Sequence, residues 1–424
     1  MKDETLAVHA GFKSDPTTKA VSPPIYQTVA YEFDDAAHGA ALFNLEVEGN
    51  IYSRIMNPTV GILEQRSAEL EGGIAGLGLS AGSAAINYAI LNIAEQGNNI
   101  VTVPLLYGGT YTLFKHMLPK LGIDVRFAAD DSVAEMEKHI DAKTTAIYAE
   151  SIGNPAGNVV DIEALAEMAH AHGVPLIIDN TVATPYLTKP IQYGADIVVH
   201  SLTKYMAGHG NTLGGMIIDA GQFPWAEHAE RFHMLNEPED SYHGVVYTEA
   251  LGPAAYIGRA RTVPLRNKGS SLSAMNAFLI LQGLATLPLR MDRHCDNALA
   301  VAKHLQSHPK VEWVKYGGLE SSKYYDLAQK YAGGKPSALL SFGIKGGFDA
   351  GVKFYDALEL FTRLVNIGDV KSLAAHPAST THRQLTEAEL ESAGVTPDMI
   401  RLCVGIEHID DILADIDQAL AAAG

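Results

Sequence analysis

The sequence predicts an α/β fold with a large, mostly parallel sheet covered by helices on both faces. An N-terminal arm precedes this domain and a smaller C-terminal α+β domain follows it. Three observations support this prediction: strand and helix patterns alternate from about residue 60 to 220, the first sixty residues lack that rhythm, and long helices dominate after about residue 270. A chain of 424 residues is also too long for one simple core. We therefore expect an arm over residues 1–60, a large domain over 61–268 and a small domain over 269–424.

Six apolar runs are expected to form the large sheet. Helical stretches separate them, such as residues 161–173, which begin with the potential cap Asp161 and end at Gly173. The repetition of strand, helix and strand predicts parallel strands with helices on both faces. The runs are NIVTVPL (99–105), DVRFAA (124–129), TTAIYAE (144–150), PLIIDN (175–180), DIVVHS (196–201) and LGGMIID (213–219).

The segments outside this pattern differ in character. Residues 1–60 contain SPPIYQT and YSRIMNPT, whose prolines and turn residues indicate an extended arm. Residues 220–268 look rich in loops, and such a long irregular segment is usually a functional or assembly surface. Residues 273–305 predict one or two long helices. The rest of the small domain should contain strands at 311–316, 338–346 and 400–407, with helices at 349–360 and 408–422.

Composition excludes several functional classes. The formal net charge of -18 disfavours a nucleic-acid partner, because phosphate binding requires a basic surface. No apolar stretch of about 18 residues predicts a membrane span, and the first residues lack the apolar core of a signal peptide. The two cysteines, Cys295 and Cys403, form no disulfide framework. We expect a cytoplasmic protein that does not associate with membranes.

Chemically active side chains follow the predicted strands. In open α/β sheets, ligands bind at the carboxyl ends of the strands. The loop GLSAGSAA (78–85) adds a glycine-containing helix start to the groups collected there. No metal-ligand quartet accompanies them, and we predict no metal. The collected residues are Tyr107, Asn154, Asp179, Ser201, Thr203, Lys204, Gly82 and Ser83.

This set of groups matches pyridoxal 5'-phosphate, which has an aldehyde, a ring nitrogen, a phenolic oxygen and a phosphate. A lysine such as Lys204 can form a Schiff base with the aldehyde and later shuttle protons. Asp179 can keep the ring nitrogen protonated, which makes the ring an electron sink. Tyr107 can stack on the ring and Asn154 can bond the phenolic oxygen. The helix start at Gly82 and Ser83, with the hydroxyls of Ser201 and Thr203, can hold the phosphate.

Each of these residues has an ordinary alternative interpretation when it is taken alone. A lysine after a strand is usually a solvated surface residue, and Asp179 with Asn180 could simply form a turn. The convergence of several strand ends on one edge favours a site. Two other motifs carry less weight. EGGIAGLGLSAG (71–82) does not follow the dinucleotide-binding glycine order, and His376 and His382 lack the spacing typical of a metal site.

Seven motifs, given at the end of this paragraph in chain order, resemble those of the Cys/Met-metabolism family of pyridoxal-phosphate enzymes, which has fold type I. The resemblance implies the roles given above for the strand-end residues. It also implies that Tyr52 and Arg54 of the arm reach the phosphate of a neighbouring subunit. Arg401 would clamp the substrate α-carboxylate through its two-pronged fork, with Ser372 beside it. The motifs are YSRIMNPT, LYGGTY, ESIGNPAGNVVDI, IIDNTVATPYL, VVHSLTKYMAGHG, SLAAHPASTTH and IRLCVGIEHIDDILADI.

Within this family, NEPEDSYHGVVY (236–247) and NIGDVKSLAAHPASTTH (366–382) are similar to the O-acetylhomoserine sulfhydrylase branch. That resemblance implies γ-replacement, in which O-acetyl-L-homoserine and sulfide give L-homocysteine and acetate in methionine biosynthesis, catalysed by Lys204 with help from Tyr107. It also implies a homotetramer built as a dimer of dimers. A cystathionine γ-synthase or a methionine or cystathionine γ-lyase remains an alternative, although γ-lyases tend to carry a cysteine at the position of Gly109. A catalytically silent assembly protein is the alternative from another class. The acyl group (acetyl or succinyl), the nucleophile (sulfide or another thiol such as methanethiol) and any sulfur-carrier partner stay open.

Overall fold

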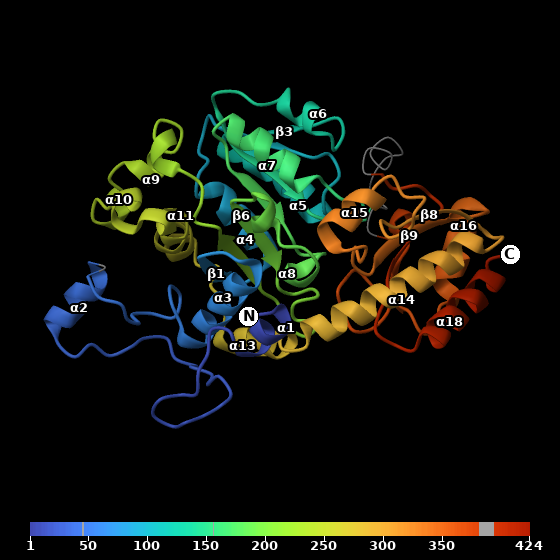
Figure 1. The fold of residues 1–424 in the computed structure, drawn as a ribbon, viewed down its shortest axis with the longest axis horizontal. Coiled ribbons are helices and arrows are strands. Elements are labelled where there is room, and N and C mark those ends of the chain that lie inside the picture. The colour runs from blue at the N-terminus through green and yellow to red at the C-terminus, as the bar shows by residue number, and fades with distance from the viewer. Residues whose placement is uncertain (45, 156, 381–393) are drawn as a thin grey trace.

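The computed structural model describes residues 1–44, 46–155, 157–380 and 394–424. Its chain contains a large seven-stranded sheet and a smaller five-stranded sheet, each packed against helices (Figure 1). The α/β fold class predicted from the sequence is confirmed. The boundaries of the three predicted segments stay a prediction, although the two sheets lie on either side of the boundary expected near residue 268.

The large sheet has the strand order β1-β7-β6-β5-β4-β2-β3. Strands β3, β2, β4, β5 and β6 are parallel neighbours, whereas β7 runs antiparallel to both β6 and β1. All six predicted runs form strands. The strands are β1 (Ala75–Leu79), β2 (Asn99–Thr102), β3 (Asp124–Phe127), β4 (Thr144–Glu150), β5 (Leu176–Asp179), β6 (Ile197–Ser201) and β7 (Gly215–Asp219).

Strand β1 was not predicted, because its sequence AGLGL resembles a glycine-rich loop. Its glycines allow helix α3 (Pro58–Glu71) to pack closely against it. A Cβ at Gly76 would lie 2.8 Å from the carbonyl oxygen of Glu64, and one at Gly78 would lie 2.9 Å from a methyl group of Val60. Glycine is therefore required here for close packing rather than for chain reversal.

Helices cover the large sheet. Helix α4 (Gly82–Leu91) packs on β6 and β7, and α7 (Ile162–Ala171) packs on β5. The predicted cap of α7 is present, because the Asp161 side chain accepts a hydrogen bond from the N–H of Ala164 over 3.4 Å. The other helices of this region are α5 (Gly108–Thr112), α6 (Val133–Glu137), α8 (Thr184–Leu187), α9 (His233–Asn236), α10 (Tyr247–Leu251), α11 (Ala255–Ala260) and α12 (Arg266–Lys268).

The small domain follows two helices, α13 (Ala274–Leu284) and α14 (Leu287–Ser307). Helix α14 contacts α8 near the large sheet and also β8, β9 and α18, so it extends from one domain into the other (Figure 1). The two shortest strands, β10 and β11, were not predicted. The five-stranded sheet contains β10 (Thr362–Arg363), β11 (Leu373–Ala375), β12 (Met399–Cys403), β9 (Leu339–Ile344) and β8 (Val311–Lys315), with helices α15 (Tyr325–Ala332), α16 (Gly347–Ala357) and α18 (Ile409–Ala422).

The N-terminal arm is only partly extended. Helix α1 (Asp3–His9) packs against α3 and α14, and the Arg66 guanidinium donates a hydrogen bond to the Ala10 carbonyl over 2.8 Å. Beyond α1 the chain leaves the body of the molecule, carries the short helix α2 (Ala36–Phe43) and returns to α3 (Figure 1). Val21 and Val29 are exposed on this excursion. The expected arm therefore begins after an anchored helix.

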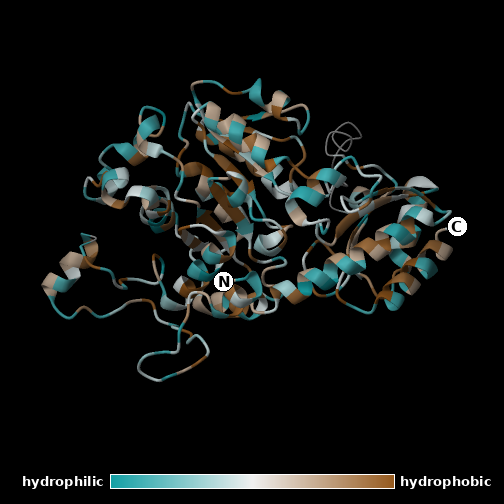
Figure 2. Cartoon of the chain, viewed as in Figure 1, coloured by the Kyte–Doolittle hydropathy of each residue, from teal (hydrophilic) through white to brown (hydrophobic). Residues whose placement is uncertain are grey.

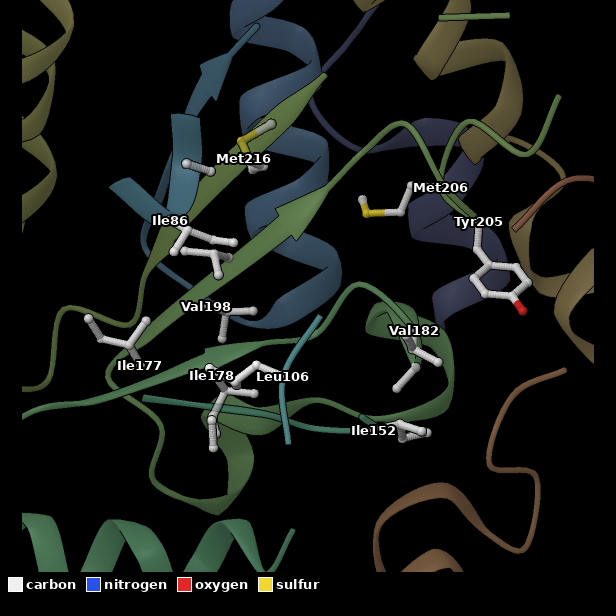
Figure 3. Close-up of a cluster of buried hydrophobic side chains, with 14 of the residues drawn as sticks. Ile86, Leu106, Ile152, Ile177, Ile178, Val182, Val198, Tyr205, Met206 and Met216 are labelled. Carbon is white, nitrogen blue, oxygen red and sulfur yellow. The ribbon is translucent and has the colours of Figure 1, made fainter. Parts of the chain in front are cut away.

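Apolar side chains fill the interior of the large domain. The central strands are the most hydrophobic part of the ribbon in Figure 2. Figure 3 shows Ile177, Ile178 and Val198 of β5 and β6 in one cluster with Ile86 and Val182. The last two also line the pocket described below, so the pocket rests directly on the packed core. Among the described helices, none combines the length and apolarity needed to cross a membrane.

Candidate active site

A pocket of about 290 Å³ opens at the carboxyl ends of three neighbouring parallel strands. Glu150, Asp179 and Ser201 are the last residues of β4, β5 and β6, and all three line it. The start of α4 closes one side, and the small domain contributes Asn366 and Arg401. The site therefore lies where ligands of open α/β sheets usually bind, and it needs both domains to be complete.

Lys204 lies in the turn that follows β6 and projects into this pocket. Its ammonium nitrogen donates a hydrogen bond to Oδ1 of Asn366 over 2.6 Å. Burial lowers the pKa of Lys204 below its ordinary value, and the positive charge of Arg401 lowers it further. Both effects favour the uncharged amine, which is the nucleophilic form of lysine.

Asp179 lies at the floor of the pocket between two donors. The N–H of Thr181 donates to Oδ1 over 3.0 Å, and the hydroxyl of Tyr148 donates to Oδ2 over 3.3 Å. Enclosure by the protein raises the pKa of Asp179, and no Lys or Arg of the described chain forms a salt bridge with it. A ligand that carries a protonated ring nitrogen would supply the missing positive partner.

Glu150 is a second carboxyl in the pocket, and it is buried. Desolvation raises its pKa to about 8, and the nearby Asp179 charge raises it too. Two enclosed carboxyls cannot easily both be ionised without a cation between them. Burial therefore raises the pKa of both carboxyls, and a positively charged ligand group beside Asp179 would relieve the repulsion between them.

The opposite end of the pocket has the features of a phosphate site. Helix α4 begins at Gly82 without a side-chain cap, so the N–H groups of Gly82 and Ser83 are available to an anion. A Cβ at Gly82 would lie 2.6 Å from the Cβ of Ser201, so glycine is required for this close approach. The hydroxyls of Ser201 and Thr203 lie beside this helix start in the same pocket.

Tyr107 and Asn154 lie between these two ends. Tyr107 precedes α5, lines the pocket and is 49% exposed, so its ring is available to a ligand. A Cβ at Gly109 would lie 2.6 Å from the Tyr107 ring, so glycine leaves room for this ring. Asn154 accepts a hydrogen bond from Arg401 over 3.2 Å. The sequence prediction brought all eight strand-end and helix-start residues to one edge, and the structure places all eight around this one pocket.

Arg401 is the cation of the small domain at this site. It projects from β12, and its two terminal nitrogens contact Asn154 Oδ1 and the carbonyl oxygen of Asn366 over 3.2 and 3.1 Å. Its Nε is buried and has no partner among the described residues, and burial lowers the pKa of the guanidinium. A buried guanidinium with an unused donor is suited to a carboxylate ligand.

Ser372 does not lie beside Arg401 in this pocket, which corrects the expectation from the sequence. Its side chain is buried elsewhere, donates a hydrogen bond to Glu407 Oε2 over 2.9 Å and accepts one from the N–H of Gly405 over 2.9 Å. Asn366 occupies the position next to Arg401 instead. Between the two residues the chain bends at Gly368, whose φ of +74° favours glycine.

The two arm residues do not line the pocket of their own chain. Arg54 lies over the ring of Tyr52 at 5.3 Å and donates a hydrogen bond to the Arg266 carbonyl. Their role toward a neighbouring subunit stays a prediction. His376 bonds to Ser379 and to the Pro397 carbonyl, whereas His382 lies outside the described residues.

Glu150 and Asn366 are two of the pocket residues that the sequence analysis missed. Glu150 ends the run TTAIYAE, so the strand-end rule that identified Asp179 could also have identified it. Asn366 follows β10 in an irregular segment with no periodic pattern. Only the folded chain brings it to Lys204.

Three comparisons with known proteins agree with this geometry. The family model described as Cys/Met metabolism PLP-dependent enzyme matches residues 4–421. The chain is 51% identical to homocysteine synthase of Schizosaccharomyces pombe, covering 99% of this chain and 98% of the relative, and 51% identical to O-acetyl-L-homoserine sulfhydrylase of Leptospira meyeri, covering 99% and 96%. A crystal structure from Campylobacter jejuni superposes with a TM-score of 0.95 at 42% identity, covering 99% of this chain and 100% of that one. That structure carries N'-pyridoxyl-lysine-5'-monophosphate at its position 205.

Proposed function

The chain belongs to the Cys/Met metabolism PLP-dependent enzymes, and from this premise we propose that it catalyses γ-replacement on an O-acylated homoserine. The reaction joins O-acetyl-L-homoserine and sulfide to give L-homocysteine and acetate. The observation that carries the proposal is the meeting of Lys204, Asp179 and Arg401 around one pocket. The first two suit the cofactor, and the third suits the carboxylate of an amino-acid substrate.

Pyridoxal 5'-phosphate is the cofactor, and its ring stabilises negative charge that develops on the substrate carbons. Lys204 holds the cofactor and, once released, removes and returns protons at the substrate carbons. Asp179 keeps the ring nitrogen protonated. Gly82, Ser83, Ser201 and Thr203 hold the phosphate, and Asn154 faces the phenolic oxygen. The ring of Tyr107 covers one face, and its hydroxyl assists departure of the acyl group.

The substrate is oriented by the small domain. The Arg401 guanidinium binds the α-carboxylate, and its buried Nε provides a donor that no described residue uses. Asn366 holds Lys204 and Arg401 in adjacent positions, because its side chain and its carbonyl contact one each. This arrangement supports an orientation in which the substrate α-carbon lies next to the lysine nitrogen that exchanges its proton.

The pocket favours the acetyl over the succinyl donor. Among the described lining residues, Lys204 and Arg401 are the basic ones, and both already have partners in the reaction. The lining also includes the apolar Leu213, Val365 and Ile367. A succinyl group would bring a second carboxylate into these surroundings without a positive partner, which costs free energy.

We infer an assembly of two dimers that form a tetramer. The arm supports this inference, because it leaves the body of its own chain with exposed valines, and because Tyr52 and Arg54 lie outside their own pocket. In that assembly the two residues reach the cofactor phosphate of the neighbouring subunit. A role in methionine biosynthesis and a cytoplasmic location complete the proposal.

A steady-state comparison of acyl donors and acceptors tests this function. We expect sulfide with O-acetyl-L-homoserine to give the highest kcat/KM, and O-succinyl-L-homoserine to give a value at least tenfold lower. Faster turnover with cysteine as acceptor would indicate a cystathionine γ-synthase. Release of an α-keto acid without any acceptor would indicate a γ-lyase. Either of these outcomes would overturn the proposal.

A further inference from the structure

Glu150 contacts two loops of the pocket at once. Its Oε1 accepts a hydrogen bond from the N–H of Tyr107 over 2.6 Å, and its Oε2 accepts one from the N–H of Asn154 over 3.3 Å. The side chain is only 4% exposed. One carboxyl at the end of β4 therefore ties together the loop that follows β2 and the loop that follows β4.

These two loops carry groups with distinct tasks in the proposed reaction. Tyr107 presents its ring to the pocket, and Asn154 lies next to the predicted phenolic oxygen. The Asn154 side chain also accepts the hydrogen bond from Arg401. Through Asn154, Glu150 is thus linked to the residue that binds the substrate carboxylate.

We propose that Glu150 is a positioning residue that fixes the ring-facing Tyr107 and the Asn154–Arg401 pair in one arrangement. This inference rests on the proposed function of the pocket and assigns a task to a residue that the function itself does not require. The two hydrogen bonds of Glu150 have different effects. The bond to the Tyr107 amide serves the cofactor, and the bond to the Asn154 amide serves the substrate.

Opposing effects act on the charge of Glu150. Desolvation and the nearby Asp179 charge raise its pKa to about 8, whereas the hydrogen bonds from the N–H groups of Tyr107 and Asn154 lower it. The two amides therefore stabilise the carboxylate form, in which both oxygens can accept.

Two substitutions separate the contacts. Glu150→Ala removes both acceptors. Glu150→Gln has nearly the same shape as glutamate, so its amide oxygen can still accept from Tyr107, while its NH₂ group faces the N–H of Asn154 and forms no bond. Asp415→Asn serves as a matched control, because Asp415 is a buried carboxylate that accepts backbone N–H groups of residues 359–361 far from the pocket.

The experiment measures three quantities for each variant. Amide hydrogen exchange at Tyr107 and Asn154 is measured in the cofactor-free protein. Cofactor affinity is measured by titration with pyridoxal phosphate. KM for O-acetyl-L-homoserine is measured in the enzyme loaded with cofactor. For Glu150→Ala we expect faster exchange at both amides. We also expect cofactor affinity to fall about tenfold and KM to rise about tenfold. For Glu150→Gln we expect faster exchange at Asn154 alone, a raised KM and nearly unchanged cofactor affinity. Asp415→Asn should lower the unfolding temperature only.

Two results would overturn the inference. One is unchanged exchange, affinity and KM in Glu150→Ala. The other is a set of changes in both Glu150 variants that Asp415→Asn reproduces at an equal loss of thermal stability, since that would reveal a purely structural carboxyl. If the wild-type protein bound the cofactor but lacked sulfhydrylase activity, the proposed function would fail, while exchange and cofactor affinity would still test Glu150.

Discussion

The hydroxyl of Tyr148 donates a hydrogen bond to Oδ2 of Asp179 over 3.3 Å, from a ring that is completely buried between β4 and its neighbours. The N–H of Thr181 holds the other carboxylate oxygen over 3.0 Å. Asp179 is therefore fixed from both sides, and its orientation toward the pocket does not depend on a ligand. Such preorganised charge is effective because it needs no rearrangement during the reaction.

Replacing Asp179 by Asn should lower kcat by about 10²-fold or more, because the amide cannot keep a ring nitrogen protonated. The measurement is steady-state turnover with saturating cofactor. Asp219→Asn is the matched control, since Asp219 is a buried carboxyl at the end of β7, which β6 separates from β5, and it lies outside the pocket. Equal kcat values for the two variants would contradict the role given to Asp179.

Replacing Arg401 by Lys should raise KM for O-acetyl-L-homoserine about 10- to 100-fold, because one ammonium cannot reproduce two parallel hydrogen bonds to a carboxylate. We expect kcat to change less than KM. Arg259→Lys provides the control, because Arg259 is also buried but bonds to Asn92 and Glu239 away from the pocket. An unchanged KM in Arg401→Lys would place the carboxylate elsewhere.

Asn366 and Ser372 should behave in opposite ways. Asn366→Ala removes the amide that holds Lys204, so kcat/KM should fall with little change in stability. Ser372→Ala removes the hydroxyl between Glu407 and the N–H of Gly405, so the free energy of unfolding should fall by about 1–2 kcal/mol while KM is retained. Steady-state kinetics and urea unfolding of both variants test this prediction. A raised KM in Ser372→Ala, with kcat/KM retained in Asn366→Ala, would show that Ser372 belongs to the substrate site.

His294 should make the protein sensitive to acid. It is completely buried, its Nδ1 contacts the Val404 carbonyl over 2.6 Å, and burial lowers its pKa to about 4. The unfolded chain, with an ordinary histidine pKa near 6.5, binds more protons between these values. The stability contribution is complete above pH 6.5 and is lost as the pH falls toward 4, by about 3 kcal/mol in total.

Urea unfolding of the wild type and of His294→Gln between pH 7 and 4 measures this effect. The difference in the free energy of unfolding between the two proteins should shrink as the pH falls, because glutamine does not titrate. A difference that stays constant across this range would show that His294 is not buried in its neutral form.

The strands and most of the site could be predicted from the sequence, because both depend on short apolar runs and on the polar residues that follow them. Buried parallel strands are short apolar runs, and the runs of β4, β5 and β6 end where polar residues enter the pocket. Asp179, Ser201 and Lys204 were found in this way. Glu150 obeys the same rule, but an acidic residue at the end of a strand is usually a solvated one, and nothing in the sequence showed that Tyr107 and Asn154 would enclose it.

The remaining features depend on contacts distant in the sequence. Strand β1 consists largely of glycine and leucine, and only the packing of α3 explains its composition. Asn366 and Ser372 lie six residues apart on either side of a bend at Gly368, and Asn366 is the one that contacts Arg401. A Cβ at Gly368 would lie 2.5 Å from the Tyr205 nitrogen, so this turn is set by the chain next to Lys204.

The most direct test of the central claim locates the cofactor on the chain. The holoenzyme is treated with borohydride, which fixes the cofactor to the lysine that carries it, and the tryptic peptides are then weighed by mass spectrometry. We predict that the added mass lies on the peptide that contains Lys204, and that Lys204→Ala shows neither this mass nor the visible absorbance of the holoenzyme. Cofactor mass on a different lysine, or a visible band retained by Lys204→Ala, would contradict the account.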